Sequence, residues 1–215
     1  MRAAILLAGG RGARLGGVDK ASLTQHGRTL LKHWIEALSV RGAEEIVVVG
    51  PEHLKDQVSM LPYASKEPGG GGDPYVRERP NVTVVREEPA YGGPAAAVYA
   101  GMQALQAQTG HVLLLAVDVV DPGPLLNWLL DQAAGSGAEA VVPLDWEGRD
   151  QFLSSAVPVQ ALREQMLGLD AQTVEGGRVR TLLAPIPHRR PVMPAHLGKD
   201  VDRPEDARRL GVNLP

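Results

Sequence analysis

The chain has 215 residues, of which 44% are hydrophobic and 22% are charged, so wholesale disorder is excluded. Its 22 basic and 25 acidic side chains give a net charge of −3, which argues against binding nucleic acid through bulk neutralisation of phosphates. Because the chain contains no cysteine, disulfides, thiolate zinc sites, iron–sulfur clusters and cysteine nucleophiles are excluded.

Five short apolar runs have the length and composition of β-strands. Most are continuous instead of alternating, which is typical of strands buried on both faces of a parallel sheet. The runs cover residues 3–7, 45–49, 82–85, 112–117 and 138–142. The first is too short for the core of a signal peptide, and none approaches the roughly 18 apolar residues of a membrane span. We therefore expect a cytoplasmic protein that has no contact with a membrane.

Helical patterns separate these runs. In residues 30–38 apolar side chains recur with the spacing of one helix face, and Gly42 follows as a stop. Residues 94–107 and 125–134 indicate two more helices, the second opened by Asp121 and Pro122. Strands that alternate with helices indicate βαβ units. We predict an α/β fold, a three-layer α/β/α sandwich with a mostly parallel, Rossmann-like sheet, formed by residues 1–215 as a single domain.

Two parts of the chain depart from this rhythm. Residues 62–81 hold four prolines and four glycines with few apolar side chains, which predicts a mobile surface insertion. Beyond residue 143 we expect a strand at 151–157 and helices at 159–167 and 178–184. Near the end of the chain, Asp202 and Glu205 have the spacing of a capping box that opens a final helix.

The strongest chemical signal follows the first strand. Residues 7–20 have the sequence LAGGRGARLGGVDK, a loop with five glycines, two arginines and one lysine. Ligands of open α/β sheets bind beyond the carboxyl ends of the strands, and glycine N–H groups beside cations suit a polyphosphate. The P-loop pattern fails because no glycine precedes Lys-Ser or Lys-Thr, and the dinucleotide fingerprint fails because the spacing is GxGxxxG.

This loop resembles the nucleotidyltransferase signature LAGGxxxRxGGxDK, in particular that of the molybdenum cofactor guanylyltransferase family, which joins GMP to molybdopterin. The resemblance continues at the GGP motif of residues 92–94, at Asp118 after an apolar strand, and at the terminal sequence DVDRPED. The resemblance spans nearly the whole chain, with residues 62–81 outside it. Val117 replaces the family's cysteine, and the proline that follows Asp118 in the family is displaced to Pro122. The family implies a fold of the nucleotide-diphospho-sugar transferase type.

The resemblance also implies a Mg²⁺-dependent guanylyltransferase whose catalytic residues are Lys20, Arg14 and Asp118. Asp118 is the expected Mg²⁺ ligand and Asp202 the second, although a helix N-cap would explain Asp202 equally well. Asp200 is a weaker alternative to Asp202. Lys20 would contact the α-phosphoryl group, and Arg14 would bind the β- or γ-phosphate as pyrophosphate leaves.

A guanine site and an acceptor site follow from the same resemblance. The family's acidic residue before the GGP motif falls on Glu87 or Glu88, and we favour Glu87, which could accept from guanine N1–H and N2–H₂ together. Gly9 favours GTP, because relatives that use CTP tend to have alanine there. Arg149 is the expected acceptor anchor, although the following Gln-Phe departs from the family's pattern. The expected nucleotide-binding residues are Leu7, Ala8, Gly9, Gly10, Lys20, Gly50, Glu87, Gly93 and Asp118.

We therefore expect an enzyme that transfers GMP from GTP to a phosphorylated acceptor, with molybdopterin as the first choice. The sequence leaves open another acceptor, a CTP-dependent molybdopterin cytidylyltransferase, and a nucleotide-binding regulatory protein without turnover. A nicotinamide oxidoreductase is the remaining α/β alternative. The expected partners are small molecules, GTP and molybdopterin, and the six histidines have no spacing typical of a zinc site.

Overall fold

A central sheet of seven strands organises residues 3–10, 12–61 and 80–214, which the computed structural model describes. The strands are β1 (Ala3–Leu7), β4 (Glu45–Val49), β5 (Asn81–Val85), β6 (His111–Ala116), β7 (Ala140–Val141), β8 (Ser154–Pro158) and β9 (His188–Arg189). Their order across the sheet is β5-β4-β1-β6-β8-β7-β9. β8 is antiparallel to both of its neighbours, and the other adjacent strands are parallel.

The register of the central strands places their carboxyl ends at one edge of the sheet. β1 pairs in parallel with β4 and β6, so that Leu7 lies beside both Val49 and Ala116. β4 pairs in turn with β5, and Val49 lies beside Val85. The loops that follow these four strands therefore begin at the same edge, where open α/β sheets bind ligands.

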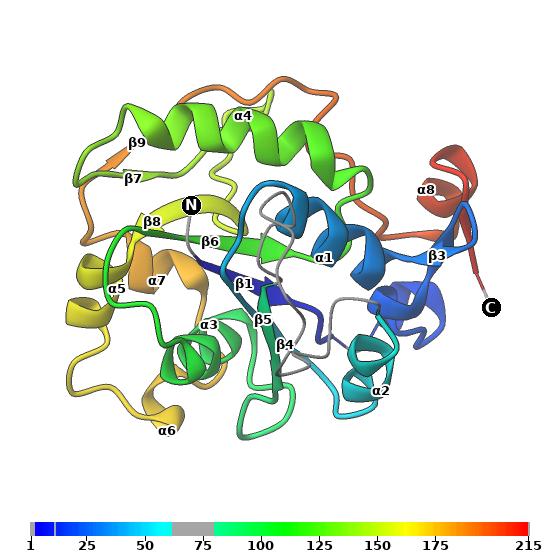
Figure 1. The fold of residues 1–215 in the computed structure, drawn as a ribbon, viewed down its shortest axis with the longest axis horizontal. Helices are drawn as coiled ribbons and strands as arrows, with labels where there is room; N and C mark the ends of the chain where they lie inside the picture. Colours follow the sequence, from blue (N-terminus) through cyan, green and yellow to red (C-terminus); the bar gives the residue numbers. More distant parts are fainter. Residues whose placement is uncertain (1–2, 11, 62–79, 215) are drawn as a thin grey trace, which may run out of the picture.

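Helices cover both faces of this sheet (Figure 1). The helices are α1 (Leu30–Val40) and α4 (Pro122–Ala134) on one face, and α3 (Pro94–Ala104), α5 (Val159–Gln165), α6 (Ala171–Val174) and α7 (Val179–Leu183) on the other. Adjacent residues of β1 point to opposite faces: Leu6 packs in the core with α1 and α4, whereas Ile5 packs in the core with α3 and α7. The predicted three-layer sandwich with a mostly parallel sheet is confirmed.

A glycine allows α3 to approach the sheet closely. Gly101 lies within α3, and a Cβ atom at this position would lie 2.6 Å from Cγ2 of Ile5 in β1. Glycine ordinarily weakens the interior of a helix. Its presence here is explained by the short distance between helix and sheet.

A second, small sheet ties the end of the chain to its beginning. β10 (Val212–Asn213) pairs with β2 (Thr24–Gln25), which pairs with β3 (Arg28–Thr29), and both pairings are antiparallel. The helix before β10 is α8 (Pro204–Arg209), which Figure 1 shows beside β3. This connection returns the segment that precedes α8 to the neighbourhood of the loop after β1.

The final helix is capped one residue later than predicted. Its N-cap is Arg203, not Asp202, and the carboxylate of Asp206, not Glu205, accepts the hydrogen bond from the Arg203 N–H at 3.0 Å. The sequence DxxED offers two acidic residues one position apart, and local spacing alone does not separate them. Asp202 consequently lies outside the helix cap.

Other element boundaries differ from the predictions by a few residues. The strand expected at 138–142 shortens to β7, and the strand expected at 151–157 begins later, as β8. A short helix, α2 (Leu54–Ser59), was not predicted, because six residues carry too little periodicity. The predicted insertion lies outside the described residues except for Pro80 and Asn81, the second of which begins β5. Among the described helices, none combines the length and the apolar character needed to cross a membrane.

Candidate active site

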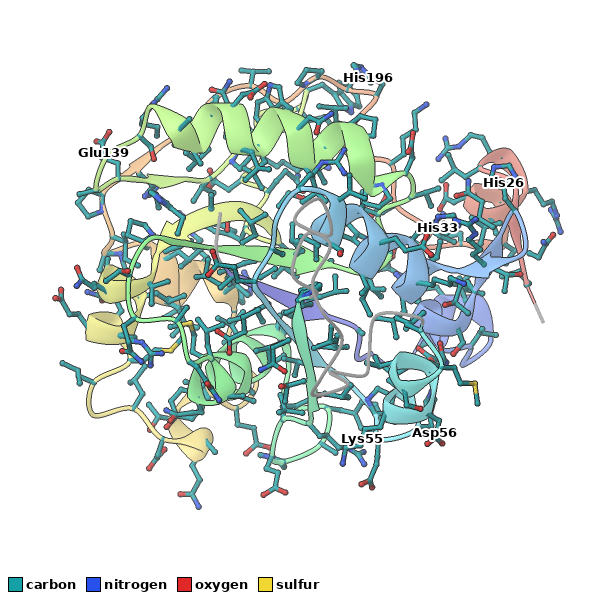
Figure 2. The ribbon with its side chains drawn as sticks, in the orientation of Figure 1. His26, His33, Lys55, Asp56, Glu139 and His196 are labelled. Carbon is teal, nitrogen blue, oxygen red and sulfur yellow. The ribbon has the colours of Figure 1, made fainter. Side chains whose placement is uncertain are left out.

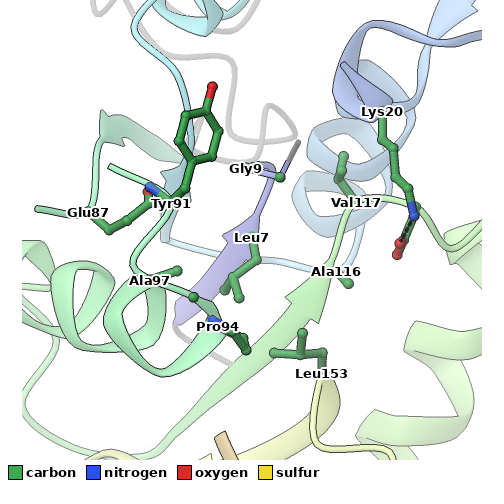
Figure 3. Close-up of a pocket in the computed structure, with 13 residues that line it drawn as sticks. Leu7, Gly9, Lys20, Glu87, Tyr91, Pro94, Ala97, Ala116, Val117 and Leu153 are labelled. Carbon is green, nitrogen blue, oxygen red and sulfur yellow. Dashed lines mark hydrogen bonds and ion pairs between the residues drawn. The ribbon is translucent and has the colours of Figure 1, made fainter. Parts of the chain in front are cut away.

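A cavity of about 320 Å³ opens at the carboxyl edge of the sheet (Figure 3). The expected nucleotide-binding residues line it, except for Ala8 and Gly50. Ala8 lines an adjoining hollow of about 340 Å³, which shares Lys20 and Asp118 with the cavity. Gly50 lies behind the wall, with its Cα 3.6 Å from the position of a Cβ on Gly9. The cavity is lined by Leu7, Gly9, Gly10, Lys20, Glu87, Tyr91, Gly93, Pro94, Ala97, Ala116, Val117, Asp118 and Leu153.

Lys20 joins two carboxylates that come from distant parts of the chain. Its Nζ donates to Oδ2 of Asp118 at 2.7 Å and to Oδ1 of Asp202 at 2.5 Å. Asp118 lies just beyond β6, Lys20 begins the 3₁₀ turn Lys20–Ser22, and Asp202 precedes α8. The structure thus brings together two of the residues expected to act in catalysis, Lys20 and Asp118, with Asp202, the second expected metal ligand.

Mutual contacts set the charges of this cluster. Burial opposes the charge of the Lys20 ammonium, but Asp118 and Asp202 outweigh it and raise the pKa of Lys20. The hydrogen bond from Lys20 lowers the pKa of Asp202, and Arg14 adds to this effect. Asp200 behaves in the opposite way, because burial and the nearby charges of Asp118 and Asp202 raise its pKa. Lys20 is therefore a cation and Asp202 an anion at neutral pH.

Backbone hydrogen bonds hold the C-terminal segment against the turn after β6. The N–H of Val201 donates to the carbonyl of Asp118 at 3.0 Å, and the N–H of Val120 donates to the carbonyl of Lys199 at 2.9 Å. Asp202 follows Val201 directly. This pairing, and not a helix cap, brings Asp202 to Lys20.

A buried tryptophan holds the turn that carries Asp118. The indole N–H of Trp34, in α1, donates to the carbonyl of Val117 at 3.2 Å and to that of Val119 at 3.0 Å. Trp34 is fully buried. It therefore fixes the backbone on both sides of Asp118 from within the core. The helical spacing predicted that Trp34 would be part of an apolar face, but no pattern in the sequence indicated this contact.

The turn that presents Lys20 is fixed by the residue before it. The carboxylate of Asp19 accepts from the Ala21 N–H at 3.0 Å and from the Ser22 hydroxyl at 2.7 Å. Nε2 of His53, next to α2, lies 2.9 Å from the same carboxylate. Asp19 therefore acts as a cap that orients Lys20 toward the cavity.

Arg14 and the glycines of the loop surround the adjoining hollow. Nη1 of Arg14 lies 3.1 Å from Oδ2 of Asp202, and most of the Arg14 side chain is exposed. Gly12 has a φ of +52°, and a Cβ there would lie 2.1 Å from the carbonyl oxygen of Val18. The loop can therefore close on itself only with glycine at this position. The backbone of the loop and the guanidinium enclose a space suited to phosphate groups.

A single buried carboxylate lies on the far side of the cavity. Glu87 is 7% exposed, and its Oε1 accepts from the Tyr91 N–H at 3.2 Å. Figure 3 shows both residues across the cavity from Lys20. The neighbouring Glu88 is exposed and does not line the cavity. Of the two candidates for base recognition, the structure places only Glu87 at the cavity.

Arg149 lies apart from the nucleotide cavity. Its side chain is 74% exposed, pairs with Glu147, and lines a different hollow of about 340 Å³ together with Trp146 and Asp200. Asp200 forms an antiparallel bridge with Val119, the residue after Asp118. The hollow at Arg149 therefore borders the cluster around Lys20 without belonging to the cavity.

The histidines are dispersed over the molecule. Figure 2 shows His26 and His33 on the side of α8 and His196 above α4. In residues 3–10, 12–61 and 80–214, no group of three or more His, Asp or Glu side chains is arranged to hold a metal ion.

The family model of the MobA-like NTP transferase domain matches residues 4–191 of this chain. The chain belongs to the MobA-like NTP transferase family. Proteins named molybdenum cofactor guanylyltransferase match it from Acidiphilium cryptum, at 36% identity over 74% of this chain and 67% of the relative, and from Pseudomonas fluorescens, at 29% identity over 74% and 68%. The chain is accordingly a nucleotidyltransferase.

Solved structures of low sequence identity share the fold. Molybdopterin-guanine dinucleotide biosynthesis protein A from Archaeoglobus fulgidus superimposes with a TM-score of 0.65 at 16% identity, covering 98% of this chain and 97% of that one. A Mycobacterium tuberculosis protein crystallised in complex with manganese gives a TM-score of 0.63 at 15% identity, covering 97% of each chain.

Tyr91 and Leu153 line the cavity of this MobA-like transferase, and neither was predicted. An aromatic residue just before the GGP motif was the available signal for Tyr91. Leu153 lies immediately before β8, which joins the sheet beside β6 from a distant part of the chain. No local pattern in the sequence predicts the pairing of β8 with β6.

Proposed function

We propose that this protein transfers GMP from GTP to the terminal phosphate of molybdopterin and releases pyrophosphate. The observation that carries the proposal is the convergence of Lys20, Asp118 and Asp202 beside a cavity whose opposite wall holds the buried Glu87. The names of the relatives support the same nucleotide and the same acceptor.

The donor set fits Mg²⁺. Asp118 and Asp202 direct carboxylate oxygens at one cation, the Lys20 ammonium, so their common space already accommodates positive charge. Mg²⁺ usually takes only one or two carboxylates and completes its shell with water and substrate phosphates. Asp118 and Asp202 would hold the ion, which when bound would neutralise charge on the phosphates. The manganese complex of the structural relative supports a divalent cation in this fold.

The residues of the chain position the reacting groups. Lys20 would turn from the carboxylates to the α-phosphate and stabilise the charge that develops there, and Arg14 would bind the departing pyrophosphate. An oxygen of the acceptor phosphate forms the new bond to the α-phosphorus as the bond to the pyrophosphate oxygen breaks. Positioning and neutralisation suffice for this exchange, and no covalent intermediate with the protein is needed.

Base selection would depend on Glu87. A buried carboxylate can accept from guanine N1–H and N2–H₂ together, whereas adenine presents no such pair of donors. An added Cβ at Gly9 would lie 3.7 Å from Oε1 of Glu87, so glycine at this position leaves the carboxylate accessible to the base. These features favour GTP.

The acceptor would bind in the hollow at Arg149. Asp200, which lines this hollow, pairs with Val119 beside Asp118, so an acceptor bound there would lie near the α-phosphate. The Arg149 guanidinium would meet the negative charge of a phosphorylated acceptor. Arg149→Ala would then raise the KM for the acceptor and leave the KM for GTP unchanged.

Pyrophosphate release from GTP, CTP, ATP and ITP, with and without molybdopterin, tests the proposal. We expect release that needs both GTP and molybdopterin, and loss of turnover in Asp118→Ala with the fold retained. Preference for CTP would favour a cytidylyltransferase. GTP binding without release in the presence of molybdopterin and Mg²⁺ would favour a regulatory protein.

A further inference from the structure

Tyr91 adopts a backbone conformation that its side chain disfavours. Its φ is +63°, in the left-handed region, which bulky residues other than glycine rarely occupy. Strained residues of this kind persist where the surrounding structure requires them, and they concentrate at ligand sites. Glycine, the residue type that follows at positions 92 and 93, would adopt this φ without strain.

Tyr91 makes contacts through both its backbone and its side chain. Its N–H donates to Oε1 of Glu87 at 3.2 Å. Tyr91 is one of the residues that line the cavity, and it is 52% exposed (Figure 3). The guanidinium of Arg86 lies 5.9 Å from the ring centroid, within range of a cation–π interaction that steadies the ring. One residue thus holds the buried carboxylate with its backbone and presents an aromatic surface to the same cavity.

We propose that the ring of Tyr91 is the stacking surface for the nucleobase. This inference rests on the proposed function, because it assigns the base to the cavity at Glu87. A base whose edge faces Glu87 leaves its two faces uncovered. On one side it would meet the glycine backbone at Gly9 and Gly10, which offers no side chain. Tyr91 supplies the other side, and base–aromatic stacking is favourable for every base.

The division of labour between the two residues gives distinct signatures. Stacking contacts the face of the base and does not depend on the groups at its edge. Loss of the ring should therefore weaken the binding of GTP and of ITP equally. The carboxylate reads the edge, so its loss should weaken GTP more than ITP, which lacks the 2-amino group. A residue that served only to hold Glu87 through its backbone would show neither loss on exchange of its side chain.

The test is calorimetric titration of GTP, ITP and CTP, with Mg²⁺ present, into the wild type, Tyr91→Phe and Tyr91→Leu. Stacking of one base contributes about 1–3 kcal/mol, or a factor of about 5–150 in affinity. We expect Tyr91→Leu to raise the Kd values of GTP and ITP by the same factor within this range. Tyr91→Phe keeps the ring and should stay within about twofold of the wild type. Circular dichroism and thermal unfolding would establish that both variants are folded.

Each outcome bears on the inference. Wild-type affinity in Tyr91→Leu overturns it, and so does a loss confined to GTP, because that pattern belongs to edge recognition. If the wild type prefers CTP, the proposed guanylyl transfer fails, yet the stacking role stands when Tyr91→Leu weakens CTP. If the wild type binds none of the three nucleotides, both proposals are refuted.

Discussion

Replacement of Glu87 by glutamine isolates the recognition of the guanine edge. The carboxylate is buried, and within the described part of the chain its hydrogen bond comes from the Tyr91 N–H, to Oε1. Glutamine has nearly the same shape, so the cavity should keep its form. Its amide, however, offers one acceptor and one donor group where the carboxylate offers two acceptors. One of the two guanine N–H groups would therefore face a donor.

The size of the effect follows from the loss of one charge-assisted hydrogen bond. Such bonds contribute about 1.5–3 kcal/mol, and about 1.4 kcal/mol corresponds to a factor of ten. We expect kcat/KM for GTP to fall about 10- to 150-fold in Glu87→Gln. ITP lacks the 2-amino group and can keep its N1–H bond to the amide oxygen, so its kcat/KM should fall less than about tenfold.

Pyrophosphate release at saturating acceptor measures both values. The matched control is Glu88→Gln, which removes the same charge from an exposed neighbour outside the cavity and should leave both nucleotides unaffected. The assignment of the base edge to Glu87 would be refuted by equal losses for GTP and ITP. An unchanged kcat/KM for GTP would refute it as well.

Three further substitutions test the cluster and the core that supports it. Lys20→Met should abolish turnover but raise the affinity for Mn²⁺ without nucleotide, roughly 30-fold if each of its two partly exposed contacts contributes about 1 kcal/mol; unchanged Mn²⁺ binding in an electron paramagnetic resonance titration would contradict the shared site. Trp34→Phe removes the N–H that two buried carbonyls accept from, which costs about 1–3 kcal/mol of stability. The thermal midpoint of this variant should fall, and its half-maximal activation should need more Mg²⁺. The control is Trp128→Phe, at a half-buried position, which should change only stability. Gly101→Ala should lower the free energy of unfolding in urea by about 1–3 kcal/mol through crowding against Ile5, and a gain in stability from helix propensity would show that α3 can move away from the sheet.

The fold could be predicted because its strands and its helices each have a characteristic pattern of apolar residues. Residues 45–49 are buried at every position, and such continuous burial is a property of central parallel strands. The helices between the strands instead have apolar residues at helical spacing on one face, as α1 illustrates. The edge elements carried neither pattern. β7 and β9 have two residues each, and their pairing depends on the antiparallel return of β8.

Lys20 and Asp118 could be placed together from the sequence because the sheet imposes their proximity. Each follows a buried strand, and the carboxyl ends of neighbouring parallel strands meet at one edge. Asp202 had no such constraint. Its spacing fitted a helix cap and a metal ligand equally, and only the β10–β2 pairing and the bonds from Val120 and Val201 decide between them. Long-range pairing of short segments leaves no periodic trace in a sequence.

Trp34 and Tyr91 mark a deeper limit of local patterns. Both look like ordinary packing residues, one on an apolar helix face and one in a loop. Their contributions come from single polar groups: an indole N–H shared by two carbonyls, and a backbone N–H aimed at Glu87. A sequence motif would not identify either group. Every residue except proline has a backbone N–H, and every tryptophan has an indole N–H, so the residue type alone does not reveal these contacts. What distinguishes them is a direction in space, and for Tyr91 the sign of φ. Substitutions that preserve packing but remove the directed group, such as Trp34→Phe, therefore separate positioning from stability more sharply than truncation to alanine.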